Sequence, residues 1–162
     1  MTGKTHALAG ACAALALQAT GAEVVMAAFG ALLPDMDTAQ SAAGKYAGFF
    51  AKMLPHRGPT HSLIMLLLST FINPWLGLGV LTHIFLDMMT SAGVKLLWPW
   101  GGRINFPFAK YVSNNGIVEN ALQTALVVGC VLLCIKSMDG FFSLDFSWLF
   151  NWIKNVLASK LT

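Results

Sequence analysis

A short segment between residues 55 and 62 combines two histidines, an arginine and two hydroxyl residues around a bend. It reads Pro-His-Arg-Gly-Pro-Thr-His-Ser, with His56 and His61 on either side of Gly58-Pro59. Because proline fixes its own backbone angle, such a bend could aim both imidazoles at one point. Imidazole is the commonest metal ligand in proteins. We interpret the segment as half of a metal site.

The other candidate ligands are histidines and carboxylates in separate segments. His83 and Asp87 are four residues apart and share one face of a helix. Two aspartates directly follow the helix-stopping Pro34, and two further candidates begin predicted helices. The complete set includes every histidine and most of the acidic residues: His6, Asp35, Asp37, His56, His61, His83, Asp87 and Glu119.

Each candidate also has a simpler explanation when it is taken alone. His6 fits a surface histidine near a terminus, and the pair of His83 and Asp87 fits a structural hydrogen bond. The aspartates after Pro34 fit a helix stop followed by a cap. Glu119 fits the first turn of a helix, where a carboxylate interacts favourably with the helix dipole. The argument for a metal site therefore depends on all of them converging.

The composition of the chain makes these ionisable groups unusual. The chain has 162 residues, of which 56% are hydrophobic and only 10% charged, and its mean hydropathy is +0.66. Soluble domains carry about 25% charged residues, so this chain is expected in or on a membrane. Ionisable groups in such a chain are costly unless they are paired or bound to metal. The basic residues are dispersed, which argues against a nucleic-acid partner.

The apolar segments of the sequence are expected to form helices. They predict an all-α, membrane-embedded bundle of helical hairpins with the metal site at one end. Chain reversals at Gly21 and at Asn73-Pro74 would bring the ligands together. The alternatives are one spanning helix over residues 6–33 and another over 62–86. The N-terminal apolar segment is expected to be a retained helix. The expected helices cover residues 5–17, 24–33, 61–73, 75–92 and 117–136.

Two domains are expected, a metal-binding domain at residues 1–138 and a C-terminal amphipathic segment at 139–162. A loop at 137–143 would separate the last long helix from an amphipathic helix at 144–160, which fits an interfacial anchor. Residues 93–115 mix aromatics with Pro and Gly, as at a lipid–water boundary. Within them, Arg103 fits either a lipid headgroup contact or an interface anchor. Cys12, Cys130 and Cys134 are expected to be small buried hydrophobes.

The spaced motifs resemble the YdjM/YbcI-type family of predicted membrane-bound metal-dependent hydrolases. The resemblance covers roughly residues 5–122 and is carried by four segments: 33–37 (Leu-Pro-Asp-Met-Asp), 56–62, 83–87 and 97–99 (Leu-Trp-Pro). Pro59 stands where the family more usually has Phe or Leu. The resemblance implies a bacterial or phage inner-membrane protein with a polynuclear metal centre. It places His6, Asp35, Asp37, His56, His61, His83 and Asp87 on motif positions, and it matches Glu119 to an acidic residue of a later helix.

The expected function is hydrolysis of a phosphoester in a membrane lipid or lipid-linked substrate by a hydroxide that two metals activate. Mixed imidazole and carboxylate ligands suit two or three divalent ions, with Zn or Mn preferred. Arg57 would hold the phosphate, and Glu119 or His56 would move protons. The basic residues Lys45, Lys52 and Arg57 favour a site that faces the cytoplasm.

Two other functions are consistent with the same residues. The metal could be purely structural, stabilising the fold or a partner contact, in which case its coordination should be closed. The chain could also transport protons or metal ions, in which case the ligands should lie at mid-bilayer depth. The sequence does not determine the oligomeric state.

Overall fold

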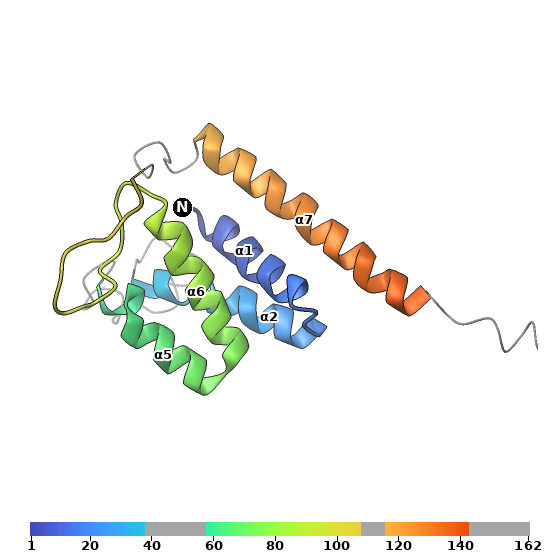
Figure 1. Ribbon diagram of the computed structural model, residues 1–162, viewed down its shortest axis with the longest axis horizontal. Coiled ribbons are helices and arrows are strands. Elements are labelled where there is room, and N and C mark those ends of the chain that lie inside the picture. Colours follow the sequence, from blue (N-terminus) through green and yellow to red (C-terminus); the bar gives the residue numbers. More distant parts are fainter. Residues whose placement is uncertain (38–57, 108–115, 143–162) are drawn as a thin grey trace, which may run out of the picture.

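The computed structural model describes residues 1–37, 58–107 and 116–142, and the regular elements among these residues are all helices, as the all-α prediction expected (Figure 1). His56, Arg57 and the C-terminal segment from residue 143 onward lie outside the described residues. The elements in chain order are α1 (Gly3–Ala16), α2 (Gly21–Gly30), the 3₁₀ turns η1 (Pro34–Asp37) and η2 (Pro59–His61), α5 (Leu63–Ile72), α6 (Pro74–Met88) and α7 (Ile117–Phe142).

The polar break after α1 ends one helix and starts the next. Gln18 has φ 59°, a left-handed conformation that terminates α1. Thr20 then forms a capping box with Glu23, whose carboxylate accepts hydrogen bonds from the Thr20 backbone and side chain. These local signals separate α1 from α2, and the two helices then pack against each other.

Asn73 and Pro74 make the corresponding break between α5 and α6. The Asn73 side chain accepts hydrogen bonds from the backbone N–H groups of Trp75 and Leu76, so it caps α6. Pro74 occupies the first helical turn, where its missing N–H costs nothing. The chain folds back here, and α5 packs on α6. With 10 and 15 residues, both helices are shorter than the ~20 residues that a bilayer span needs.

Helices α2 and α6 approach each other closely at two glycines. A Cβ atom at Gly79 of α6 would lie 2.1 Å from the carbonyl oxygen of Ala27, and one at Gly30 of α2 would lie 2.3 Å from that of Leu76. No side chain fits at either position. This contact holds the end of α2, and hence Pro34–Asp37, against α6.

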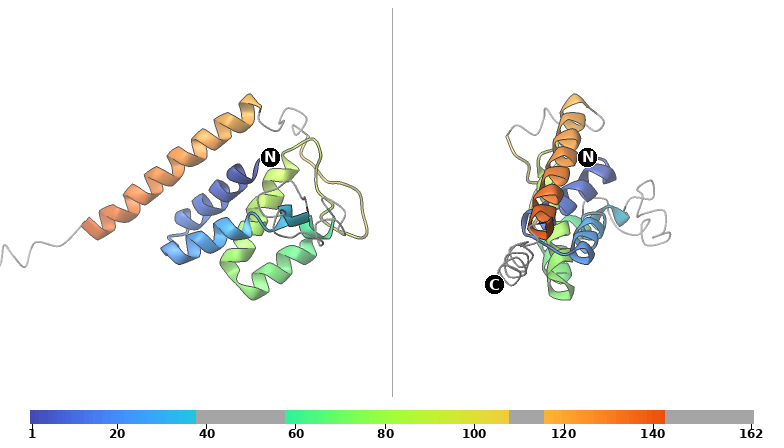
Figure 2. Two further views of the ribbon diagram at one scale, coloured as in Figure 1. Left: turned by 180° about the vertical axis from the view of Figure 1, so that it is seen from behind. Right: turned by 90° about the vertical axis from the view of Figure 1, so that its right-hand side faces the viewer.

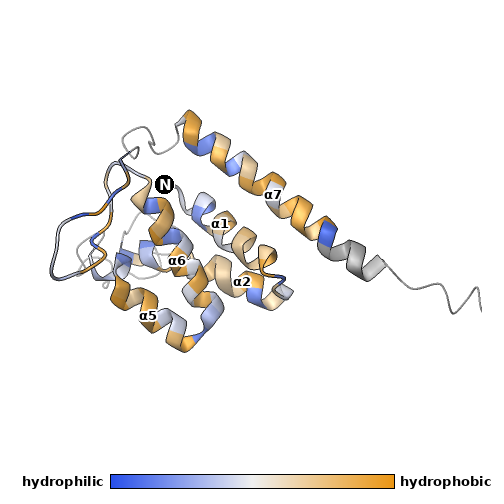
Figure 3. Ribbon diagram, viewed as in Figure 1, coloured by the Kyte–Doolittle hydropathy of each residue, from blue (hydrophilic) through white to orange (hydrophobic). Residues whose placement is uncertain are grey.

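Helix α7 lies along α1 and extends beyond it (Figure 1 and the left view of Figure 2). It is apolar along most of its length (Figure 3), and Ile117–Lys136 form the one candidate membrane span among the described residues. Twenty residues cover about 30 Å, the thickness of a bilayer core. The helix continues to Phe142, so the loop expected at residues 137–143 begins too early in that prediction.

The cysteine prediction was wrong. Cys12 of α1 and Cys130 of α7 form a disulfide, with Cα atoms 5.1 Å apart, and Cys134 is exposed. Sequence spacing gave no indication of this pair, because 118 residues separate its members.

Candidate metal centre

Four elements bring histidines and carboxylates into one cluster. His6 comes from the first turns of α1, Asp35 and Asp37 from η1, His61 from η2, and His83 and Asp87 from α6. The start of α1, the C-terminal half of α6 and the two short 3₁₀ turns therefore supply the cluster. The side chains are buried except for Asp35, which is 18% exposed.

His83 is at the centre of the cluster, and its orientation is fixed by the backbone of α2. Its Nδ1–H donates to the carbonyl oxygen of Ala31, at 2.7 Å. Because Nδ1 then carries the proton, Nε2 keeps a free lone pair. That Nε2 lies 3.2 Å from Nε2 of His61, while the His6 ring stacks on the His83 ring at a centroid distance of 3.8 Å. Metal-binding histidines are commonly oriented by such a hydrogen bond from the second ring nitrogen.

Asp87 is the carboxylate that faces all three histidines. Its Oδ1 lies 3.4 Å from His6 Nε2, and its Oδ2 lies 3.5 Å from His61 Nε2 and 3.8 Å from His83 Nε2. Its position on the same face as His83, one helical turn later, was predicted from the four-residue spacing. Both oxygens are therefore placed among imidazole nitrogens, as in a bridging carboxylate.

Asp37 and Thr60 support His61 from the other side. The Thr60 hydroxyl donates to Asp37 Oδ2 at 2.7 Å and lies 3.0 Å from His61 Nδ1. Asp37 Oδ2 is itself 3.5 Å from the same nitrogen. These contacts turn Nε2 of His61 toward His83 and Asp87.

The distances between these atoms match those between ligands that share one ion. Zn–N bonds of about 2.1 Å at tetrahedral angles place neighbouring ligand atoms about 3.4 Å apart. The separations in the cluster run from 3.2 Å, between the two Nε2 atoms, to 3.9 Å, between His83 Nε2 and Asp35 Oδ1. Two groups of three can each gather around an ion, and they share His83: His6 with His83 and Asp87, and Asp35 with His61 and His83.

The ring of His6 adds an independent indication of a missing partner. Both of its nitrogens are buried, and neither forms a hydrogen bond within the described part of the chain. At 3.4 Å, its approach to Asp87 is longer than an ordinary hydrogen bond. Since buried polar atoms are nearly always satisfied, a bound cation explains this nitrogen well. The residues present therefore fit the metal that the family resemblance implies.

Burial and mutual contacts shift the acid–base behaviour of the cluster. Burial, reinforced by a neighbouring His6, lowers the pKa of His83 well below its usual value, so His83 is a neutral imidazole. Burial would also lower the pKa of His61, but hydrogen bonds to Asp37 and Asp87 outweigh it and raise that pKa. For Asp87, burial is outweighed by the close approach of the His6 and His61 rings, and the pKa is lowered. Burial raises the pKa of Asp35.

Glu119 reaches the edge of this cluster from α7. It is buried, and its Oε1 accepts hydrogen bonds from the Thr5 hydroxyl, at 2.8 Å, and from the backbone N–H of Thr2. These contacts tie the first turn of α7 to the first turn of α1, next to His6. Glu119 does not belong to either group of potential ligands found among the described residues. The contacts fit a positioning role, and the predicted ligand and catalytic roles of Glu119 remain predictions.

Two supporting groups were missed in the sequence. Thr60 lies inside the segment that was singled out first, so its place between two candidate ligands was a usable signal. The carbonyl of Ala31 offered no signal, because every residue carries one. His56 and Arg57, which were predicted as a ligand and a phosphate-binding residue, lie outside the described residues.

Comparison with known sequences adds a family and several relatives. Residues 1–153 match the model of a family described as YdjM inner membrane protein. The protein YvsG of Bacillus subtilis (strain 168), described as uncharacterized, is 33% identical over 147 residues, which cover 79% of this chain and 91% of YvsG. The inner membrane protein YdjM of Escherichia coli (strain K12) is 36% identical over 119 residues. That match covers 62% of this chain and 60% of the relative, as does the match to YdjM of Shigella flexneri. No solved structure matches the chain.

Proposed function

The chain belongs to the YdjM family of inner membrane proteins, and on that basis we propose that it is a membrane-bound, metal-dependent hydrolase. Its proposed reaction is the cleavage of a phosphoester bond in a lipid or lipid-linked substrate. The observation that carries the proposal is the convergence of His6, His61, His83 and Asp87 at ligand-to-ligand distances in a buried site.

The donor set suggests which residues would hold metal. His6, His83 and Asp87 would hold one divalent ion, and Asp35 and His61 would hold a second together with the other oxygen of Asp87. Zn or Mn suits this mixture of nitrogen and oxygen ligands. Bound there, two divalent ions would supply Lewis acidity and a water of lowered pKa, which phosphoester hydrolysis at neutral pH requires. Asp37 would orient His61 through its contact with Nδ1 of that ring, rather than bind the metal itself.

The position of the cluster supports an amphiphilic substrate. Glu119 is in the first turn of α7, which is also the start of the candidate membrane span. A site beside that turn would lie near the headgroup level rather than at mid-bilayer depth, which argues against the transport alternative. Asp35 provides the partly exposed edge through which a substrate could reach the buried ligands. Arg57, in the adjoining segment, is proposed to bind the phosphate.

The test uses purified protein in detergent with two ligand variants. Asp87→Ala and His61→Ala should each lose bound metal, measured by inductively coupled plasma mass spectrometry, together with phospholipid cleavage. Glu23→Gln, an exposed carboxylate of the α2 capping box, is a control that should keep both. Full metal loading in both ligand variants would reject the proposal.

A structural metal remains the second candidate, and the burial of His6, His61 and His83 favours it. A structural site should be coordinatively closed, whereas a catalytic site leaves a position open. Fluoride or inorganic phosphate binding to the metal-loaded protein distinguishes the two. Either ligand should perturb the spectrum of a cobalt-substituted enzyme and leave a closed structural site unchanged.

A further inference from the structure

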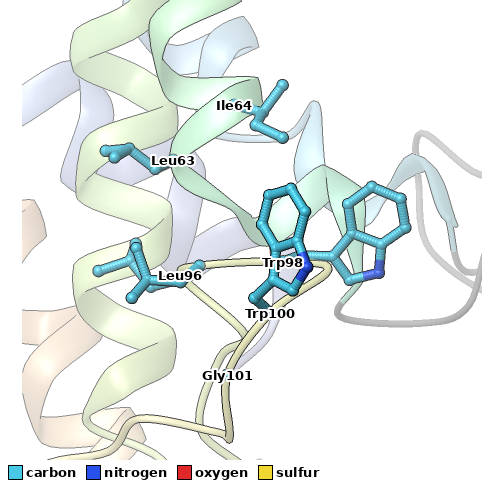
Figure 4. Close-up of a pocket in the computed structure, with 7 residues that line it drawn as sticks. Leu63, Ile64, Leu96, Trp98, Trp100 and Gly101 are labelled. Carbon is cyan, nitrogen blue, oxygen red and sulfur yellow. The ribbon is translucent and has the colours of Figure 1, made fainter.

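An apolar pocket lies between the first turn of α5 and the loop that follows α6. It has a volume of about 420 Å³ and is lined by Leu63, Ile64, Leu96, Leu97, Trp98 and Trp100. In Figure 4 Ile64 of α5 lies above the two indole rings of the loop, and Leu63 lies above Leu96. The volume lies within the usual range for small-molecule pockets, which is about 300 to 1,000 Å³. The lining offers no charged side chain, so any occupant must be apolar.

Backbone hydrogen bonds hold the loop in place around the pocket. Val94 and Ile104 pair through two hydrogen bonds, of 3.0 and 2.8 Å, that close the base of the loop. The N–H of Leu63 donates to the carbonyl oxygen of Leu96 at 2.8 Å and fastens the loop to the start of α5. The pocket is therefore formed in advance of any ligand, which lowers the entropic cost of filling it.

The pocket adjoins the candidate metal centre along the chain. Leu63 is only two residues after His61, so their Cα atoms are at most about 7 Å apart. The buried Ser62 lies between them. An elongated molecule with its apolar end in the pocket would therefore have its polar end near His61.

The charged residues of the loop indicate what kind of molecule would occupy the pocket. Lys95 and Arg103 are exposed on the same loop as Trp98 and Trp100. Basic residues near a membrane surface attract anionic lipid headgroups, and tryptophan favours the level of those headgroups. We propose that the pocket binds an acyl chain of an anionic glycerophospholipid, whose headgroup extends toward His61 and is attracted by the positive charges of Lys95 and Arg103. The proposal rests on the function proposed above, because it assigns the substrate of that site.

Photo-crosslinking tests the pocket without requiring turnover. The full-length protein in nanodiscs is irradiated with phosphatidylglycerol that carries a diazirine on one acyl chain, and the labelled residues are mapped by mass spectrometry. Labels are expected on the pocket lining. Ile64→Trp should fill the pocket and reduce labelling about tenfold, which corresponds to losing the burial of roughly two methylenes. Leu81→Trp is the matched control, since it adds the same ring to a different apolar surface, on α6.

Two further variants complete the design. Trp100→Ala opens the pocket at a highly exposed position (81%) and should reduce labelling even if Ile64→Trp does not fold. Replacing both Lys95 and Arg103 by Gln should abolish a preference for phosphatidylglycerol over phosphatidylcholine. Labelling spread over α7, or undiminished in Ile64→Trp and Trp100→Ala, would overturn the pocket assignment. If labels map to the pocket but no phosphoester is cleaved, the proposed function fails while the lipid site stands.

Discussion

The Nε2 atoms of His61 and His83 lie 3.2 Å apart, although 22 residues separate the two histidines in the chain. Nδ1 of each ring faces an oxygen: the Ala31 carbonyl for His83 and the Thr60 hydroxyl for His61. Both rings are thus turned so that their remaining nitrogens point toward the same place. Two unprotonated Nε2 atoms repel each other at this distance, and a proton or a cation between them would remove that repulsion.

Replacing His83 should reduce the metal affinity more than replacing any other candidate ligand. Because His83 belongs to both potential ligand groups, His83→Gln should weaken binding by more than about 100-fold, the upper end for losing only a supporting contact. Isothermal titration with Zn²⁺ and with Mn²⁺ after chelator treatment measures this effect. Thr124→Val, which removes an exposed hydroxyl on α7, serves as the control. An unchanged metal affinity of the His83→Gln variant would exclude a metal site that contains His83.

Thr60 is expected to matter less than a ligand but more than a surface residue. Thr60→Val removes the hydrogen bond to Asp37 and the contact with His61 while keeping the shape of the side chain. Loss of such an orienting partner typically costs about 10- to 100-fold in metal affinity. Thr60→Ser keeps the hydroxyl and should restore most of it. Equal affinities of the Val and Ser variants would show that the hydroxyl does not orient His61.

The glycine contact between α2 and α6 predicts a coupled loss of stability and metal binding. A methyl group at Gly79 would overlap the backbone of Ala27 and Ala31, and the Ala31 carbonyl holds His83. Gly79→Ala should therefore destabilise the fold by about 1–3 kcal/mol or more and also weaken metal binding. Thermal unfolding in detergent, with and without metal, measures both effects.

Gly102→Ala is the matched control for this experiment, because nothing lies within 4 Å of the added methyl group. It should leave the unfolding temperature within the error of the wild type. A Gly79→Ala variant as stable as Gly102→Ala would mean that α2 and α6 can move apart without cost.

Metal affinity should fall as the pH is lowered from 8 to 5.5. Ligands bind in their deprotonated form, so a proton competes with metal at any ligand whose pKa is near the ambient pH. The raised pKa of His61 makes it the main competitor above pH 6.5, whereas the lowered pKa values of His83 and Asp87 keep those groups free of protons there. Calorimetry near pH 7 in buffers of different ionisation enthalpy should detect proton release on binding. An affinity independent of pH would contradict this assignment.

The proposed cytoplasmic orientation fixes the direction of α7. If Glu119 begins the span on the cytoplasmic side, the other end of α7 must emerge in the periplasm. Alkaline phosphatase fused after Phe142 should then be active, and the same enzyme fused after Pro107 should be inactive. The reverse pattern of activities would place the site on the periplasmic face.

Much of the site was predictable because its determinants are local. Pro34 stops a helix, Asn73 and Pro74 start one, and a spacing of four residues puts His83 and Asp87 on one face. The low content of charge marked the histidines and carboxylates as unusual. These signals depend on backbone geometry and on residue type, which a single sequence displays.

The tertiary structure decided which of these groups meet and what supports them. The stacking of His6 on His83, the bond from His83 to the Ala31 carbonyl, and the disulfide between Cys12 and Cys130 each join residues far apart in the chain. Such contacts follow from how closely whole helices approach, as at Gly79, and not from any local preference. The sequence by itself determined the ligand chemistry and the helical segments that carry it, whereas the packing of α1, α2 and α6 determined the geometry of the site.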